Sequence, residues 1–205
     1  EGKKELFEGT WIYHNWDFTN TSPVINISFA KLDYQGMGLA TEINNFLDSI
    51  AADNNISLRA STLKKKFIEL METLGKDNPV AILIDEYDKP IIDYLEEEAI
   101  PKSLENRRIL KNFYSAVKDC DKYIQFLFIT GVSKFSKVSF FSDLNNLTDI
   151  TLSTKYSKIA GYTQSELKTN YNSYLKMLMK KFKIKREKLI ETIKLWYNGY
   201  SWDGK

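Results

Sequence analysis

Val80-Ala-Ile-Leu-Ile84, followed directly by Asp85 and Glu86, is the most informative part of the sequence. An apolar run this short, with no polar alternation, is typical of a strand that is buried on both faces, as in a parallel sheet. The two carboxylates follow where this strand ends. In open α/β sheets, ligands bind beyond the carboxyl ends of the strands. The run therefore predicts a parallel sheet with an acidic rim at a ligand site.

Other segments alternate between strand and helix patterns. Apolar, β-branched runs predict strands at residues 23–29 and 124–129, and a weaker pattern predicts one at 149–152. Apolar residues at i, i+3, i+4 and i+7 predict helices. These cover residues 38–53, a segment from Ser61 or Thr62 to residue 74 with Ser61 as a natural N-cap, and residues 91–95 and 104–118. Strands that alternate with helices indicate βαβ units. We therefore expect an α/β fold with a parallel sheet between helical layers.

The character of the chain changes near residue 160. Thr163-Gln-Ser-Glu166 matches a capping box, and helical periodicity follows over residues 167–182 and again over 185–197. We therefore expect an α/β core over residues 1–160 and the beginning of a helical C-terminal subdomain over residues 161–205.

The acidic rim has the residues of a metal and water site. A carboxylate at a strand tip can hold Mg²⁺, largely through water, and a second carboxylate beside it can orient or deprotonate an attacking water. This is the Walker B pattern, in which Asp85 takes the metal role and Glu86 the water-activating role. The alternative is an acidic turn that only caps the next helix. In that turn Asp88 fits an N-cap better than a ligand, and Pro90 suits the first helical turn.

A polar residue follows the strand predicted at 124–129. The strand runs into Thr130-Gly-Val-Ser133. In ATPases with a Walker B strand, the neighbouring strand ends in a polar residue that senses the γ-phosphate or its water. Thr130 is the first candidate for nucleotide contact and catalysis, and Ser133 is the second candidate for nucleotide contact. The alternative is a Thr that caps the strand into a glycine turn.

One string has the spacing of a phosphate-binding loop, and we reject it. Gly199-Tyr-Ser-Trp-Asp-Gly204-Lys205 follows a predicted helix rather than a strand, and large aromatic residues stand where backbone amides must surround phosphate. No other stretch of the sequence supplies the loop.

Composition excludes several classes of protein. The 205 residues are 43% hydrophobic, enough for one sizeable domain or a domain and part of another. The net charge of +2 does not suggest a nucleic-acid coat, although the lysines of 180–188, most simply a solvated helix face, leave a weak nucleic-acid patch open. A single cysteine, Cys120, excludes a disulfide framework, and a single histidine, His14, excludes His-pair metal motifs.

The sequence also bears on where the protein is located and on whether it is part of a longer chain. No apolar run reaches the roughly 18 residues of a membrane span, and no secretory leader opens the chain. We expect a cytoplasmic protein with no membrane partner. Because the chain begins with Glu1 rather than Met, we also expect a piece of a longer protein.

Several motifs in order resemble the bacterial AAA-ATPase-like family, and they span nearly the whole chain. The opening stretch resembles the segment just downstream of that family's phosphate loop. The motifs are Glu1-Gly-Lys-Lys-Glu-Leu-Phe-Glu-Gly9, Ile82-Leu-Ile-Asp-Glu-Tyr-Asp-Lys-Pro90, Phe128-Ile-Thr-Gly-Val-Ser-Lys-Phe-Ser-Lys137, Leu144-Asn-Asn-Leu-Thr-Asp-Ile150, Gly161-Tyr-Thr-Gln-Ser-Glu166 and Trp196-Tyr-Asn-Gly-Tyr-Ser-Trp-Asp-Gly204.

The resemblance implies a P-loop NTPase core with strand order 5-1-4-3-2. The predicted strands would be numbers 2 to 5, and strand 1, which delivers the phosphate loop, would be missing. ATP and Mg²⁺ are then the cofactors of the full-length protein, and this piece alone is expected to be inactive. Many family members also end in a PD-(D/E)xK nuclease-like domain, which leaves nucleic acid, beside nucleotide and a homo-oligomer, among the expected partners.

Two other functions stay open. The same scaffold could serve as a regulatory or protein-interaction module that does not hydrolyse ATP. A metal-dependent nuclease built on residues 85–89 ranks lower. In such nucleases the acidic residues and the lysine are spread over separate elements, whereas here they all follow the end of one predicted strand.

Overall fold

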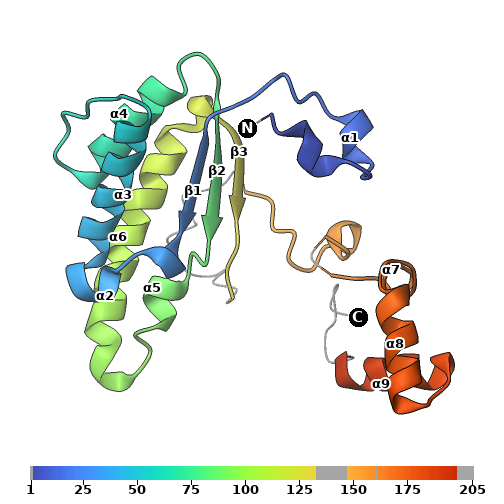
Figure 1. Ribbon diagram of the computed structural model, residues 1–205. Helices are drawn as coiled ribbons and strands as arrows, with labels where there is room; N and C mark the ends of the chain where they lie inside the picture. The colour runs from blue at the N-terminus through green and yellow to red at the C-terminus, as the bar shows by residue number, and fades with distance from the viewer. Residues whose placement is uncertain (1, 133–146, 160, 198–205) are drawn as a thin grey trace. The chain divides into compact units, whose positions relative to one another are not determined.

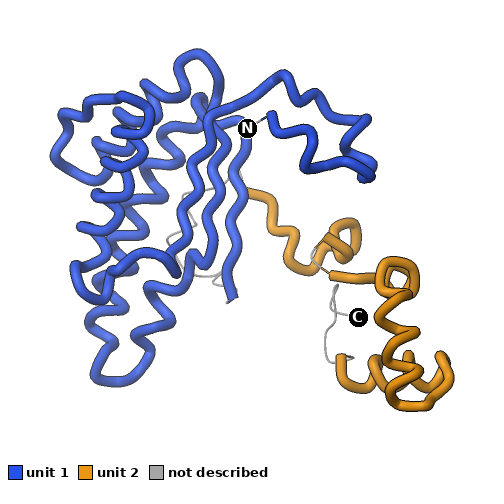
Figure 2. Tube along the Cα trace, in the orientation of Figure 1, with its two compact units in different colours: residues 1–145 blue, residues 146–205 orange. Residues whose placement is uncertain are grey.

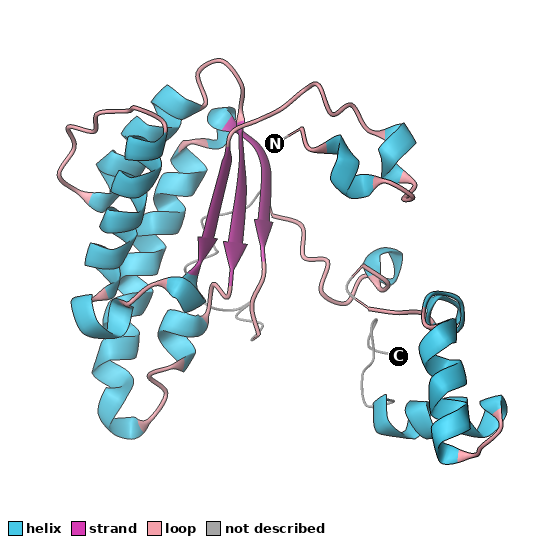
Figure 3. Cartoon of the chain, in the orientation of Figure 1, coloured by secondary structure: helices cyan, strands magenta, loops and turns pink. Residues whose placement is uncertain are grey.

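A computed structural model of the chain describes residues 2–132, 147–159 and 161–197 (Figure 1). The chain divides into two compact units, residues 1–145 and residues 146–205 (Figure 2). The first unit contains the strands, and the described regular elements of the second unit are helices (Figure 3).

Three parallel strands form the sheet of the first unit. They are β1 (Val24–Ser28), β2 (Val80–Asp85) and β3 (Ile124–Ile129), and they lie in the order β1-β2-β3. The strand predictions for these three segments are confirmed. Their order and parallel pairing are compatible with a P-loop-like sheet.

Helices cover one face of this sheet, and the hydrophobic core lies between the helices and the sheet. Figure 1 shows α3, α4 and α6 packed side by side on that face. The side chains of Ile25, Ile27, Ile82 and Ile84 point into this core and are at most 2% exposed. The helices of this unit are α1 (Ile12–Asn15), α2 (Tyr34–Met37), α3 (Leu39–Asp53), α4 (Leu63–Leu74), α5 (Lys89–Ile92) and α6 (Ile100–Asp119), with short 3₁₀ turns η1 (Lys4–Phe7), η2 (Phe29–Lys31), η3 (Glu97–Ala99) and η4 (Asp121–Tyr123).

The opposite face of the sheet is less buried than the sequence predicts. The register places Val24 beside Ala81 and Ala81 beside Phe126 on this face, where Val24 is 42% and Phe126 is 54% exposed. Ala81 and Leu83 are only partly buried, so the expectation that β2 is buried on both faces is wrong for the described residues. Because α3, α4 and α6 share one face, the described part of this unit shows two of the three expected layers.

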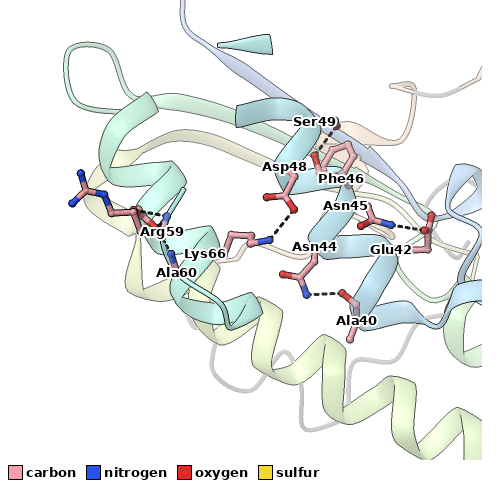
Figure 4. A network of polar contacts seen from close by, with 11 residues as sticks. Ala40, Glu42, Asn44, Asn45, Phe46, Asp48, Ser49, Arg59, Ala60 and Lys66 are labelled. Atoms are coloured by element: carbon pink, nitrogen blue, oxygen red, sulfur yellow. Dashed lines mark hydrogen bonds and ion pairs between the residues drawn. The ribbon is translucent and has the colours of Figure 1, made fainter. Parts of the chain in front are cut away.

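Polar contacts hold α3, α4 and the loop between them together (Figure 4). Lys66 of α4 forms an ion pair with Asp48 of α3, with Nζ 2.8 Å from Oδ2. The carboxylate of Glu69 accepts hydrogen bonds from the backbone N–H groups of Arg59 and Ala60. The expected Ser61 cap is wrong: Thr62 occupies the N-cap position of α4 and makes no side-chain capping bond.

The fourth predicted strand, at residues 149–152, is wrong. The Asp149 carboxylate accepts the Thr151 N–H at 2.9 Å, and the Ser153 N–H donates to the Ile150 carbonyl at 3.1 Å. Short polar side chains that bond to nearby backbone compete with a strand ladder. The segment therefore forms a turn that leads into the 3₁₀ turn η5 (Thr154–Tyr156).

Three helices follow in the second unit: α7 (Gln164–Asn170), α8 (Asn172–Phe182) and α9 (Arg186–Tyr197). The capping box of Thr163 and Glu166 is confirmed. The single helix predicted over 167–182 is instead two helices, since Tyr171 leaves helical geometry with φ −107° and ψ 19°. The predicted helix at 185–197 is confirmed as α9.

Candidate functional site

The carboxyl ends of β2 and β3 bring two of the predicted site residues together. The strands are parallel neighbours, and Ile84 lies beside Ile129, so the residues that follow them meet at one rim of the sheet. Thr130 Oγ1 donates a hydrogen bond to Asp85 Oδ1 at 2.5 Å, and the Thr130 N–H donates to the Ile84 carbonyl at 2.8 Å. The Asp85 side chain stays exposed while it accepts this bond, so one carboxylate oxygen remains available to a ligand.

Glu86 has an unusual backbone conformation. Its φ is +53°, in the left-handed region where a residue with a Cβ costs about 1–2 kcal/mol relative to right-handed geometry. Backbone strain of this kind concentrates at active sites and ligand clamps. Two backbone hydrogen bonds stabilise the turn after Glu86. The Tyr87 N–H donates to the Thr130 carbonyl and the Lys89 N–H donates to the Glu86 carbonyl, both at 3.0 Å.

The two neighbouring acids interact with different parts of the rim. Asp85 contacts Thr130, which follows β3. The phenol of Tyr34, at the start of α2 and beyond β1, has a raised pKa because of its burial and then its hydrogen bond to Asp93, and the charge of Glu86 adds to the rise. Glu86 therefore lies within electrostatic reach of Tyr34.

A tight packing contact fixes the distance between the β2 and β3 tips. A Cβ added at Gly131 would lie 2.3 Å from Tyr87 Cε1 and 2.8 Å from Asp88 Oδ1, so only glycine fits there without a shift. Asp88 is fully buried, and its Oδ1 accepts the Val132 N–H at 3.2 Å. The two residues after Glu86 thus hold the segment that carries Thr130.

A shallow pocket of about 250 Å³ lies beside this rim. The Asp93 carboxylate at its edge accepts the Tyr34 hydroxyl at 2.5 Å and pairs with Lys89 Nζ at 3.1 Å. Figure 1 shows α2 and α5 at the same end of the sheet. The pocket is lined by Ala30, Leu32, Asp33, Tyr34, Gln35, Lys89 and Asp93.

The remaining predictions for this region have mixed outcomes. Ser133 lies outside the described residues. Pro90 stands in the first turn of α5, as expected. Asp88 occupies the N-cap position, but its side chain makes no capping bond and accepts from Val132 instead. The prediction of Asp88 as an N-cap is therefore confirmed for its position and wrong for its side chain.

Sequence reasoning missed the contributions of Tyr34, Tyr87 and Gly131. The glycine after Thr130 was noted only as a turn, although a glycine directly after a predicted strand is a signal for close backbone approach. Tyr34 left no signal, because it lies far from the acidic strand in the sequence and reaches the rim only through the fold.

Comparison with known proteins then places the chain in a family. A family model described as "Predicted AAA-ATPase" matches residues 1–141. The chain belongs to this AAA-ATPase-like family. Membership supports an ATPase-like function in general and, with it, binding of a nucleotide and Mg²⁺ by family members.

A curated relative extends the similarity over the whole chain. It is a protein of Azotobacter chroococcum mcd 1, described as an uncharacterized protein in the vnfD 5′ region, and it is 34% identical over 213 residues. The alignment covers all of this chain and 38% of the relative, so the chain spans less than half the length of that protein. No solved structure matches this AAA-ATPase-like chain. Across the described residues, no helix is both long and apolar enough to cross a membrane.

The rim of this AAA-ATPase-like chain fits Mg²⁺ only together with a phosphate ligand. Within residues 2–132, 147–159 and 161–197, no three His, Cys, Asp or Glu side chains cluster as a metal cage. Mg²⁺ ordinarily takes one or two carboxylates and completes its shell with water and substrate phosphates. An exposed carboxylate such as Asp85, with the Thr130 hydroxyl beside it, matches that ligand type.

Proposed function

We propose that residues 1–160 carry the metal-and-water half of an ATP-hydrolysing site. In this proposal Asp85 holds Mg²⁺ as the Walker B carboxylate, Glu86 positions and deprotonates the attacking water, and Thr130 senses the γ-phosphate. The observation that carries the proposal is the hydrogen bond from Thr130 to Asp85 across two adjacent strand tips. It supports a rim on which a metal ligand and a phosphate sensor act on one nucleotide.

The backbone of Glu86 supports its separate role. A left-handed glutamate is strained, and a residue that only ended the strand could relieve that strain as glycine or asparagine. A second carboxylate next to Asp85 in the chain is suited to accept a proton from water while Asp85 stays with the metal. ATP would supply the phosphate chain that both acids act on.

The phosphate-binding half is proposed to come from outside the printed residues. No string of the sequence other than the rejected one at 199–205 has the required spacing. A strand that carries the loop would pair with β3, which is an edge strand of the described sheet. Residues 1–205 alone would then not hydrolyse ATP, and residues 161–205 would begin a separate helical subdomain.

The test is phosphate release by the protein that carries these residues, with Mg-ATP as substrate. Glu86→Gln keeps the size of the side chain but removes the base, so turnover should fall by about 10²-fold or more while nucleotide still binds. Glu97→Gln, an equally isosteric change at an exposed acid of the same unit, is the matched control and should leave turnover unchanged.

Two results would count against the proposal. Equal turnover in Glu86→Gln and the unsubstituted protein would remove Glu86 from catalysis. Nucleotide binding without any phosphate release by the unsubstituted protein would favour the non-hydrolysing regulatory module instead.

A further inference from the structure

Charge is distributed very unevenly between the two units, although the chain as a whole is nearly neutral. Residues 146–205 contain twelve basic and five acidic side chains, whereas residues 1–145 contain seventeen basic and 22 acidic ones. From Leu167 to Arg186 the sequence has seven basic residues and no acidic one. A local excess of this size attracts polyanions and repels acidic partners.

The lysines of α8 lie on the exposed side of that helix. Lys176, Lys180 and Lys181 are all exposed, and none of them forms an ion pair with another described residue. The opposite side of α8 contributes Leu175, which is 2% exposed, to the contact between α8 and α9. Within the described part of the second unit, the lysines of α8 therefore make no ion pair, Lys181 Nζ lies 5.6 Å from the centre of the Phe182 ring, and Leu175 is buried.

Exposed aromatic side chains accompany these lysines. Tyr171 lies between Tyr162 and Tyr174, with ring centroids 5.3 Å and 6.3 Å away, and the two outer rings are 66% and 61% exposed. Tyr174 is on α8 itself, one turn before Met177, which is 58% exposed. A helix face that is only solvated does not require exposed tyrosines next to its lysines.

We infer that this lysine–tyrosine surface, Tyr162, Tyr174, Lys176, Lys180 and Lys181, binds single-stranded nucleic acid. Lysines that track a phosphate backbone, together with aromatic rings on which bases stack, form the usual combination for single strands without sequence preference. Ammonium groups act on phosphate as point charges, so the lysines supply affinity rather than sequence recognition.

The packing of α8 against its neighbours favours nucleic acid over a membrane as the partner. An amphipathic helix that lies on a bilayer inserts its apolar face among the lipids. Here Leu175 and Leu189, the buried residues of α8 and α9, are 2% and 4% exposed, so this part of the apolar face is covered. What remains exposed on α8 beside the lysines is the Tyr174 ring together with Met177 and Phe182, which are 58% and 57% exposed. The inference rests on the second unit alone and stands or falls independently of ATP hydrolysis at the rim.

The experiment measures binding of the whole chain to a labelled oligothymidylate and a labelled oligouridylate by fluorescence anisotropy. The triple variant Lys176→Glu, Lys180→Glu and Lys181→Glu should weaken binding at least ~10-fold and lower the slope of log affinity against log salt by about 2, since single strands lose about 0.7 per phosphate contact. The control triple Lys65→Glu, Lys111→Glu and Lys118→Glu changes the net charge equally, at exposed positions of the first unit. It should change affinity less than ~2-fold.

Substitutions at Tyr174 test the stacking part of the inference. Tyr174→Ala should weaken single-strand binding about 5-fold or more, whereas Tyr174→Phe, which keeps the ring, should not. Duplex DNA of the same length should bind more weakly than the single strand. Circular dichroism should show unchanged helix content in every variant.

Each of the following results would overturn the inference. The two lysine triples weaken binding equally, duplex binds as tightly as single strand, or Tyr174→Ala has no effect. Binding to vesicles of anionic phospholipid without binding to either oligonucleotide would overturn it as well.

Discussion

Thr130 Oγ1 lies 2.5 Å from Asp85 Oδ1 and donates a hydrogen bond to it. The two residues follow adjacent parallel strands, so the bond closes the rim of the sheet at the point where β2 and β3 end. It connects the proposed metal ligand to the proposed phosphate sensor, so a substitution at one residue should change the position of the other side chain.

Thr130→Val removes the donor and keeps the shape of the side chain. If Thr130 holds Asp85 for the metal, turnover of the protein that carries these residues should fall about 10-fold or more, equivalent to about 1.4 kcal/mol of transition-state stabilisation. The Mg²⁺ concentration needed for half-maximal rate should rise as well. Thr130→Ser restores the hydroxyl and should recover most of the activity. Equal rates for the Val and Ser variants would show that the hydroxyl is not used.

At position 86, a glycine variant should be more stable than an alanine variant, which is the reverse of the order in a helix interior. At its φ of +53°, glycine avoids the left-handed strain that alanine keeps. We expect Glu86→Gly to unfold with a free energy about 0.5–1 kcal/mol larger than that of Glu86→Ala. In the helix interior at Glu105 of α6 the same pair should show the opposite order, by about 1 kcal/mol. Urea unfolding of the four variants measures both differences, and the same order at both sites would contradict the strain.

Gly131→Ala should destabilise the first unit through its contact with Tyr87. The new methyl group would lie 2.3 Å from the Tyr87 ring, and such overpacking costs about 1–3 kcal/mol. In a Tyr87→Ala background the ring is gone, so the cost of Gly131→Ala should become clearly smaller. A double-mutant cycle by denaturant unfolding measures this coupling. Identical costs in the two backgrounds would exclude the proposed contact.

Cys120 should make stability depend on alkaline pH. Burial, with a smaller contribution from Asp119, raises the pKa of its thiol to about 12, against about 8.5 in an unfolded chain. Below the pKa of the thiol in the unfolded chain, Cys120 is protonated in both the folded and the unfolded state. Its full contribution to the free energy of unfolding is then present. As pH rises from about 8.5 to 12, the unfolded state alone loses the proton, and stability falls by at most about 1.4 kcal/mol per pH unit.

The Cys120→Ala variant isolates this effect from the tyrosines, which titrate in both proteins. The difference in unfolding free energy between the unsubstituted chain and the variant should shrink as pH is raised from about 8 to about 10.5. In the folded chain near pH 8 the buried thiol should also resist alkylation. If this difference in unfolding free energy stayed constant across the pH range, the Cys120 thiol would ionise as readily in the folded state as in the unfolded state.

Local sequence patterns predicted most of the elements in this chain. Apolar runs located β1, β2 and β3, and the Thr163–Glu166 pair located the start of α7, because hydrophobic periodicity and capping act over only a few residues. The failures occurred where a local pattern was ambiguous. Residues 149–152 read as a strand, but the Asp149 side chain bonds to nearby backbone, and the helix expected over 167–182 is interrupted at Tyr171.

The sequence by itself determined that two acids follow a buried strand and that a threonine follows another, since both facts are matters of order along the chain. Only the tertiary structure decided that Thr130 bonds to Asp85, that Glu86 occupies a left-handed turn, and that a ring fills the space a Cβ at Gly131 would need. These relationships depend on which strands are neighbours and in which register. Pairing of distant segments is set by packing of the whole core, and no short stretch of sequence contains that information.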